Sequence, residues 1–204
     1  MKKNFIFGLV SLLVVILMFA FVYFLFFKDS VNDSVETSAL ITEFDQLVQD
    51  NPELQSFVDE IEKWESKQAE DPERVETFNT LGMAWKSLGD RTKDDRHYER
   101  ALEVYKEGIE RTDGKNTLFL KNAAAMSKYL KRYEDVEGFY LSAIEVAPGE
   151  QATYIELAEL YEYQLKKNSE EIISLLDSGI ERAVISSIIQ SHKQRYLNRS
   201  QNNN

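Results

Sequence analysis

The fold is decided by residues 116–148, which read NTLFLKNAAAMSKYLKRYEDVEGFYLSAIEVAP. In the first half of this stretch, apolar or small residues recur at helical intervals, at positions 120, 123, 124, 127 and 130. A second stripe of the same period runs from Tyr133 to Ile144, and Pro148, which cannot donate a backbone hydrogen bond, ends it. The pattern predicts two helices folded back on each other. Such a hairpin is apolar on too much of its surface to stand alone, so it needs similar hairpins on both sides.

The same pattern occurs before and after this stretch, with a period near 35 residues. Equivalent positions of the second helix, at intervals of 35 and 36 residues, are occupied by Tyr105, Tyr140 and Leu176. Equivalent positions of the first helix are occupied by the pairs Leu81-Gly82, Ala123-Ala124 and Leu157-Ala158. The intervals between these pairs are 42 and 34 residues, and the longer one marks an insertion. Three hairpins in register favour an all-α stack over a generic helical bundle.

The insertion comprises Arg91–His97, between the two helices of the first hairpin. Its length corresponds to about two helical turns. The helices of that hairpin are therefore expected to be longer and to project past their neighbours. A binding loop is the alternative, but the mixed charges of the segment favour a solvated helical extension.

These hairpins resemble the tetratricopeptide repeat (TPR), a helix-turn-helix unit of about 34 residues with the signature W-x2-L-G-x2-Y, then A-x3-F, then P. The resemblance is carried by Phe78, Leu81, Gly82, Trp85, Ala101, Tyr105 and Gly108 in the first unit, by Leu120, Ala123, Ala124, Val136, Tyr140, Ala143 and Pro148 in the second, and by Tyr154, Leu157, Ala158, Tyr161, Leu176 and Gly179 in the third. It covers Val75 to Val184. It departs from the family at Ser127, where an aromatic residue is preferred, and at Ile172, where alanine is preferred. The resemblance implies an all-α solenoid that binds other proteins.

Composition excludes several other classes of protein. The 204 residues include only three prolines and eight glycines, which leaves little room for a turn-rich β fold. The chain has no cysteine, so disulfides, thiolate metal sites and cysteine nucleophiles are excluded. The net charge is −11, and no basic patch with interleaved aromatic residues is present. Nucleic acid is therefore not an expected partner.

An apolar segment precedes the repeats. Residues 5–27 are 23 residues without a charge, with Lys2 and Lys3 before them and Lys28 after. As a helix they would be roughly 35 Å long, enough to cross a bilayer core of about 30 Å. A signal peptide is the alternative, but its apolar core is usually about 7–15 residues long and an A-x-A-like cleavage site should follow it. An uncleaved transmembrane anchor is the favoured interpretation.

The lysines also predict an orientation. Two precede the apolar segment and one follows it, so the N-terminus is expected in the cytoplasm. The protein is then a single-pass protein of the cell (plasma or inner) membrane, and its repeats lie outside the cytoplasm.

The expected organisation has five segments. They are a transmembrane anchor (1–28), a polar linker (29–39), a helical cap or degenerate repeat (40–72), three TPR-like repeats (73–184), and a capping helix with a disordered tail from Ser200 (185–204).

No arrangement of residues points to catalysis. The chain has two histidines, His97 and His192, which are 95 residues apart and outside any metal-ligand spacing. Nucleophile-elbow, zinc-protease and dinucleotide-binding motifs are missing from the sequence. We therefore expect no catalytic, cofactor-binding or metal-binding residues and no enzyme activity.

The resemblance also implies a protein-binding groove, because in this family the first helix of each hairpin lines the inner face. The positions concerned are Glu76, Asn79, Met83 and Lys86, then Leu118, Lys121, Ala125, Lys128 and Tyr129, then Ala152, Ile155, Glu159 and Glu162. Lysines lie on one side of this surface and glutamates on the other, with apolar residues between them. The expected ligand is a segment of mixed charge with an apolar anchor, bound weakly enough to be sensitive to salt.

Two functions fit these observations. The first is a membrane-anchored scaffold or adaptor that binds a partner segment in the concave groove. The second is an accessory or assembly factor of a membrane protein complex, which acts through lateral helix pairing or self-association as a homo-oligomer. An exposed apolar face on Ile185 to Ile189 would favour the second function.

Overall fold

The structure is a computed structural model, and it describes residues 44–183 and 185–202. These residues divide into two units, one ending at Gln55 and the other beginning at Ser56. In the first unit residues 44–50 are helical and Pro52–Leu54 forms the short 3-10 helix η1. Between them Asn51 donates to the carbonyl of Leu47 from both its backbone N–H (2.9 Å) and its side-chain amide (3.2 Å), which closes the turn before Pro52.

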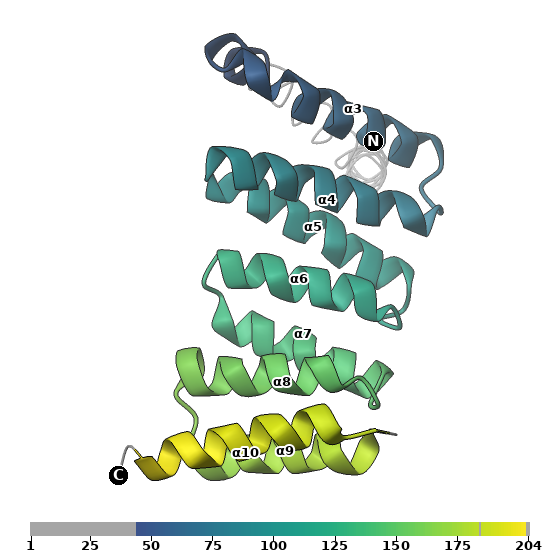
Figure 1. The fold of residues 1–204 in the computed structure, drawn as a ribbon. Coiled ribbons are helices and arrows are strands. Elements are labelled where there is room, and N and C mark those ends of the chain that lie inside the picture. Colours follow the sequence, from purple (N-terminus) through teal and green to yellow (C-terminus); the bar gives the residue numbers. More distant parts are fainter. Residues whose placement is uncertain (1–43, 184, 203–204) are drawn as a thin grey trace, which may run out of the picture. The chain divides into compact units, whose positions relative to one another are not determined.

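The second unit is a series of helices joined by short turns. They are α3 (Gln55–Glu70), α4 (Val75–Thr92), α5 (Asp95–Arg111), α6 (Thr117–Tyr129), α7 (Tyr133–Val146), α8 (Gln151–Leu160), the π-helix η2 (Tyr161–Leu165), α9 (Ser169–Arg182) and α10 (Ser187–Asn202). From α4 to α9 each helix packs on the next, and α10 packs on both α8 and α9. Figure 1 shows the hairpins α4–α5, α6–α7 and α8–α9 following one another from blue to yellow. The predicted all-α stack of helical hairpins is confirmed.

Small residues occupy the contacts between helices, as the sequence pattern requires. In the first hairpin a Cβ atom on Gly82 would lie 2.5 Å from the ring of Tyr105. In the last hairpin a Cβ atom on Gly179 would lie 2.7 Å from the ring of Tyr154. Interatomic distances this short are not tolerated in close-packed interiors, so each ring fills the space that the missing side chain leaves.

The middle hairpin uses alanine in the same role. Ala124 is fully buried in the core cluster that also holds Tyr140 and Ile144. Between the first two hairpins, the ring of Phe119 packs against Gly108, where an added Cβ would lie 2.8 Å away. Each hairpin therefore buries apolar surface against the next, through Phe119 on Gly108 and through the cluster that runs from Ala124 to Tyr196.

Side chains with oxygen acceptors begin several of these helices. Asp94 accepts from the N–H of Arg96 at 2.9 Å at the start of α5, and Asn116 accepts from Leu118 at 3.0 Å at the start of α6. Asn168 and Glu171 form a reciprocal capping box at the start of α9. Such caps satisfy N–H groups that have no partner within the helix, typically for about 1 kcal/mol each.

The insertion Arg91–His97 is helical except at Lys93 and Asp94, which connect the two helices. Helix α4 continues to Thr92 and α5 begins at Asp95, so the expected helical extension is confirmed and a binding loop is not formed. Thr92 Oγ1 is hydrogen bonded to His97 Nδ1 at 2.8 Å, and the imidazole stacks on Trp85 with ring centroids 6.0 Å apart. The extension is thus anchored to the core of its own hairpin.

Helix α10 is fastened to α9 by polar contacts. Lys193 Nζ lies 2.5 Å from Asp177, and the hydroxyl of Tyr196 donates to Ser169 Oγ at 3.1 Å. The helix runs to Asn202, beyond Ser200, where the sequence predicted the start of a disordered tail.

The expected membrane anchor, residues 5–27, and the polar linker, residues 29–39, lie outside the described residues. Within the part of the chain that the structure does describe, no helix combines the length and apolarity needed to span a bilayer.

Candidate functional site

The positions predicted to line the groove lie on α4, on α6 and on α8 with η2. None of these residues is buried. Large apolar side chains on this face stay open to solvent, since Met83 is 52% exposed, Leu118 50% and Tyr129 47%. These side chains lie on the first helices of two neighbouring hairpins and are accessible to a partner.

Two asparagines join the first helices of the first two hairpins. The side-chain amide of Asn122 on α6 donates to Asn79 Oδ1 on α4 at 3.0 Å. The amide of Asn79 donates in turn to the sulfur of Met83 at 3.7 Å. Met83 is therefore held at the junction between α4 and α6.

A pair of stacked tyrosines, Tyr98 and Tyr129, forms what we call the tyrosine platform. Their ring centroids are 4.6 Å apart and their planes differ by 6°. The hydroxyl of Tyr98 donates to Asp90 at 3.1 Å, and burial together with this hydrogen bond raises the pKa of Tyr98 to about 12. Lys86 Nζ lies 2.5 Å from Asp90 and 5.4 Å from the centroid of the Tyr129 ring. The platform is thus rigid, and the extension of α4 and α5 supports it, since Tyr98 belongs to the first turn of α5.

Several charges that were predicted to face a ligand have partners inside the protein. Lys86 pairs with Asp90, as described above, and Lys121 pairs with Glu150 at 2.6 Å. Glu162 pairs with Arg199 at 3.0 Å. The separation of positive and negative charge across this face is therefore weaker than the sequence suggested. Lys128 and Glu159 remain exposed and form no ion pair with any residue that the structure describes.

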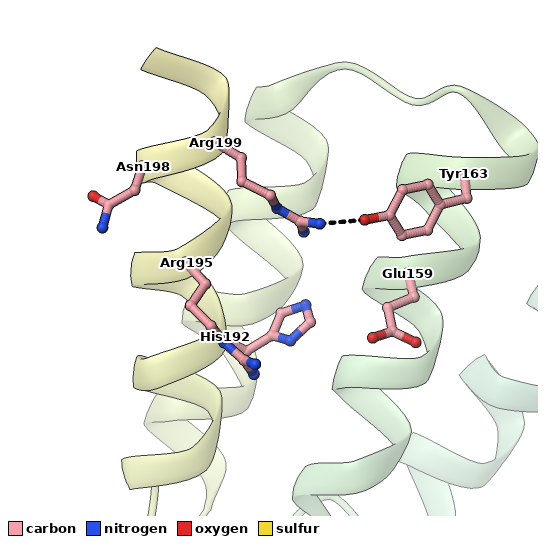
Figure 2. A pocket seen from close by; sticks show the side chains of 6 residues that line it. All are labelled: Glu159, Tyr163, His192, Arg195, Asn198 and Arg199. Atoms are coloured by element: carbon pink, nitrogen blue, oxygen red, sulfur yellow. Dashed lines mark hydrogen bonds between the residues drawn. The ribbon is translucent and has the colours of Figure 1, made fainter. Parts of the chain in front are cut away.

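A pocket of about 370 Å³ opens at the far end of this face, and we call it the terminal pocket. One wall comes from α8 and η2 and the other from α10 (Figure 2). Its lining residues are Glu159, Tyr163, His192, Arg195, Asn198 and Arg199.

One side of the terminal pocket is fixed by Arg199. Its guanidinium donates to the hydroxyl of Tyr163, lies 5.8 Å from the centroid of that ring, and pairs with Glu162. Tyr163 belongs to η2, whose wider turn distinguishes it from the α-helix before it. Short π-helical turns of this kind occur frequently at functional sites.

The interior of the terminal pocket holds a neutral histidine. His192 is only 6% exposed, and burial is the main reason why its pKa lies below the ordinary value of 6.5. Arg195 and Arg199 lower the pKa further, while Glu159 and Glu162 act in the opposite direction. Within the described residues, no group of three His, Cys, Asp or Glu side chains is arranged to hold a metal ion.

Sequence reasoning placed Glu159 and Glu162 on the binding face but missed Tyr163, Arg195, Asn198 and Arg199. The available signal was the spacing of His192, Arg195 and Arg199, which puts all three on one face of α10. That spacing could not show what the face packs against.

The sequence matches no protein-family model and no curated protein. The structure is similar to that of TTC0263, a thermophilic TPR protein in Thermus thermophilus, with 16% identity, a TM-score of 0.53, and coverage of 82% of this chain and 94% of that one. It is also similar to MamA (13% identity, TM-score 0.52, 76% of this chain and 94% of that one) and to the MamA RS-1 ArsTM double mutant (16% identity, TM-score 0.50, 80% and 97%). The fold is TPR-like. At these identities the similarity shows the fold alone.

Proposed function

We propose that this protein is a membrane-anchored scaffold that binds a segment of another protein on the face formed by α4, α6 and α8. The observation that carries the proposal is the exposure of Met83, Leu118 and Tyr129 on the first helices of neighbouring hairpins. Fully burying a side chain of this size stabilises by about 1.5–3 kcal/mol. Roughly half of each is still in contact with water, so covering it would contribute about 1 kcal/mol per residue.

The rigidity of the tyrosine platform supports the same proposal. Tyr129 is stacked on Tyr98, which is itself hydrogen bonded to Asp90. A side chain that is already immobilised loses little conformational entropy when a ligand covers it. The platform therefore suits an apolar or aromatic anchor residue of the partner.

The charges near the tyrosine platform indicate which charged residue the partner segment should carry beside its apolar anchor. Lys128 is exposed one residue before Tyr129 and pairs with no described residue, whereas Lys86 and Lys121 are already paired. An acidic residue beside the apolar anchor would pair with Lys128. Because this contact is exposed, it should add about 1 kcal/mol at most and weaken with salt.

Capture experiments with the full-length protein in detergent test this proposal. Variants carrying Met83→Asp and Tyr129→Ser should lose partners that the wild-type protein retains from solubilised membranes, as identified by mass spectrometry. Leu141→Asp is the matched control, because Leu141 is a similarly exposed apolar residue on α7. Equal retention by the groove variants and the control would refute a binding role for this face.

The membrane anchor is part of the proposal and rests on the sequence. The 23 uncharged residues 5–27 have the length of a membrane-spanning helix, and the lysines favour a cytoplasmic N-terminus. A reporter that is active only outside the cytoplasm, fused after Asn204, should be active. A reporter active only in the cytoplasm would reverse the orientation, and a purified protein that starts near Asp29 would replace the anchor with a cleaved signal.

We also propose that the protein is not an enzyme. The histidines have structural surroundings, since His97 stacks on Trp85 and is hydrogen bonded to Thr92. His192, on α10, is buried, and burial lowers its pKa so that it stays neutral. We therefore expect the capture experiment to recover a protein partner, and we expect no small-molecule substrate.

The second candidate function is lateral pairing with another copy or a similar protein. It is favoured by Ile185 and Ile188, which are exposed next to the start of α10 while Ile189 is buried. Multi-angle light scattering of the detergent-solubilised protein would then show a dimer or larger oligomer. The double substitution Ile185→Ser and Ile188→Ser should return it to the monomer, and a wild-type monomer would eliminate this candidate.

A further inference from the structure

We propose that the terminal pocket binds two oppositely charged side chains of the partner segment, a carboxylate paired with Arg195 and a cationic group paired with Glu159. The inference deepens the proposed function and rests on it, because Glu159 also belongs to the binding face of α8. It assigns the charged part of the ligand to one end of that face and the apolar anchor to the tyrosine platform.

The first argument is which charges in the pocket are free. Arg199 is committed to Glu162 and to the hydroxyl of Tyr163. Arg195 and Glu159 line the pocket from α10 and α8, and neither forms an ion pair or hydrogen bond with a residue that the structure describes. Figure 2 shows them on opposite walls. Each is therefore available to a ligand, and they face it from different sides.

The second argument is the net charge of the site. Glu159 and Arg195 line the pocket with opposite charges, and the charge of Arg199 is balanced by its partner Glu162, which lies outside the lining. The buried His192, whose pKa lies below its ordinary value, adds no charge at neutral pH. An anion alone would be attracted by Arg195 and repelled by Glu159, and a cation alone would meet the reverse. A ligand that carries both charges satisfies both walls.

The third argument is size and rigidity. The volume of about 370 Å³ lies at the small end of the range for ligand pockets, which suits one or two side chains and not a larger molecule. Helix α10 is held to α9 through Lys193 and Tyr196, and Tyr163 is held by Arg199. Walls fixed in this way need little rearrangement on binding.

Phage-displayed random dodecapeptides, selected on the full-length protein in detergent micelles, provide a test that needs no known partner. The selected peptides should contain an apolar residue and, several positions away, both an acidic and a basic residue. Their dissociation constants, measured by fluorescence anisotropy on synthetic copies, should rise roughly two- to fivefold with Glu159→Gln and with Arg195→Gln, the range for solvent-accessible charged contacts. Glu145→Gln and Arg182→Gln remove charges outside the pocket and serve as matched controls.

The reversed pocket gives a sharper test. Combining Glu159→Arg with Arg195→Glu keeps one positive and one negative side chain but exchanges their positions between the two walls. This protein should bind a peptide in which the acidic and basic residues are interchanged better than it binds the original peptide. The wild-type protein should show the opposite preference, and added salt should reduce both preferences.

Each contrary result has a distinct meaning. Selection of no peptide would overturn the proposed function and this inference together. Peptides that depend on Met83 and Tyr129 but are indifferent to Glu159→Gln and Arg195→Gln would overturn this inference alone. Peptides with acidic residues only, weakened by Arg195→Gln and not by Glu159→Gln, would show a simple anion site and overturn the paired-charge assignment.

Discussion

The first and the last hairpin are built on the same contact but present different chemistry. In both, an aromatic ring packs on a glycine of the partner helix, Tyr105 on Gly82 and Tyr154 on Gly179. The longer helices of the first hairpin supply Tyr98, which stacks on Tyr129 of the next hairpin to form the tyrosine platform, whereas in the last hairpin a π-helix and α10 frame a pocket of charged side chains. The repeat thus fixes the core, while small local departures from it decide what each end of the face can bind.

The largest expected effect breaks what the two hairpins share. Gly82→Ala and Gly179→Ala each place a methyl group within 2.8 Å of a buried ring, and each should cost about 2–3 kcal/mol of unfolding free energy through overpacking. The measurement is urea unfolding followed by circular dichroism. Gly138→Ala is the control, since a Cβ there meets nothing within 4 Å, and it should stabilise α7 by up to about 1 kcal/mol. Equal midpoints for all three variants would mean that the hairpins do not pack in this register.

These glycine contacts also show why the fold could be predicted. A repeat needs a small residue wherever two helices touch, and such positions recur at a constant interval that is visible in the sequence. The extension of α4 and α5 was predictable for the same reason, because an interval of 42 residues in place of 34 leaves room for about two added helical turns.

The terminal pocket could not be predicted in this way. Arg199 finds its partners Tyr163 and Glu162 at separations of 36 and 37 residues, so on the sequence alone it is indistinguishable from a solvated charge of a capping helix. The apolar residues before the π-helical turn keep ordinary helical spacing, so the sequence gives no sign of the turn that carries Tyr163. The pairing of Lys86 with Asp90 and of Lys121 with Glu150 depends on side-chain conformations that no spacing specifies.

The next prediction tests the support of the tyrosine platform. His97→Ala removes the stacking on Trp85 and the hydrogen bond with Thr92 and leaves a small cavity, which should cost about 2 kcal/mol. Hydrogen exchange should quicken at the C-terminal end of α4 and the N-terminal end of α5, and remain unchanged in α9 and α10. Faster exchange in the last hairpin as well would show that the two ends of the stack unfold as one unit.

The last hairpin should respond to pH through His192. Its folded pKa lies below 6.5, so the folded protein resists protonation more than the unfolded chain does. The resulting stability is complete above about pH 6.5 and is lost as pH falls through the folded pKa. Glu159 and Glu162 face the imidazole and moderate the loss, while Arg195 and Arg199 increase it. The protection factors of the α10 amides, which correct for the slower intrinsic exchange at low pH, should therefore fall between neutral pH and pH 5. In a His192→Gln variant this fall should be much smaller.

The smallest effect is expected in the middle hairpin, at Ser127. This residue stands where TPR sequences prefer an aromatic side chain, and its hydroxyl is fully buried with no hydrogen-bond partner among the described residues. A buried hydroxyl without a partner destabilises the folded state, because it leaves its hydrogen bonds with water behind. Ser127→Ala removes that cost and also improves helix propensity, so it should raise the unfolding free energy by about 0.5–1 kcal/mol. Replacement by a large aromatic residue should do the reverse, since Ser127 is completely enclosed and the site has no room for a ring. A destabilised alanine variant in urea unfolding would show that the hydroxyl does have a partner, and that the middle hairpin is held by a polar contact as the two ends are.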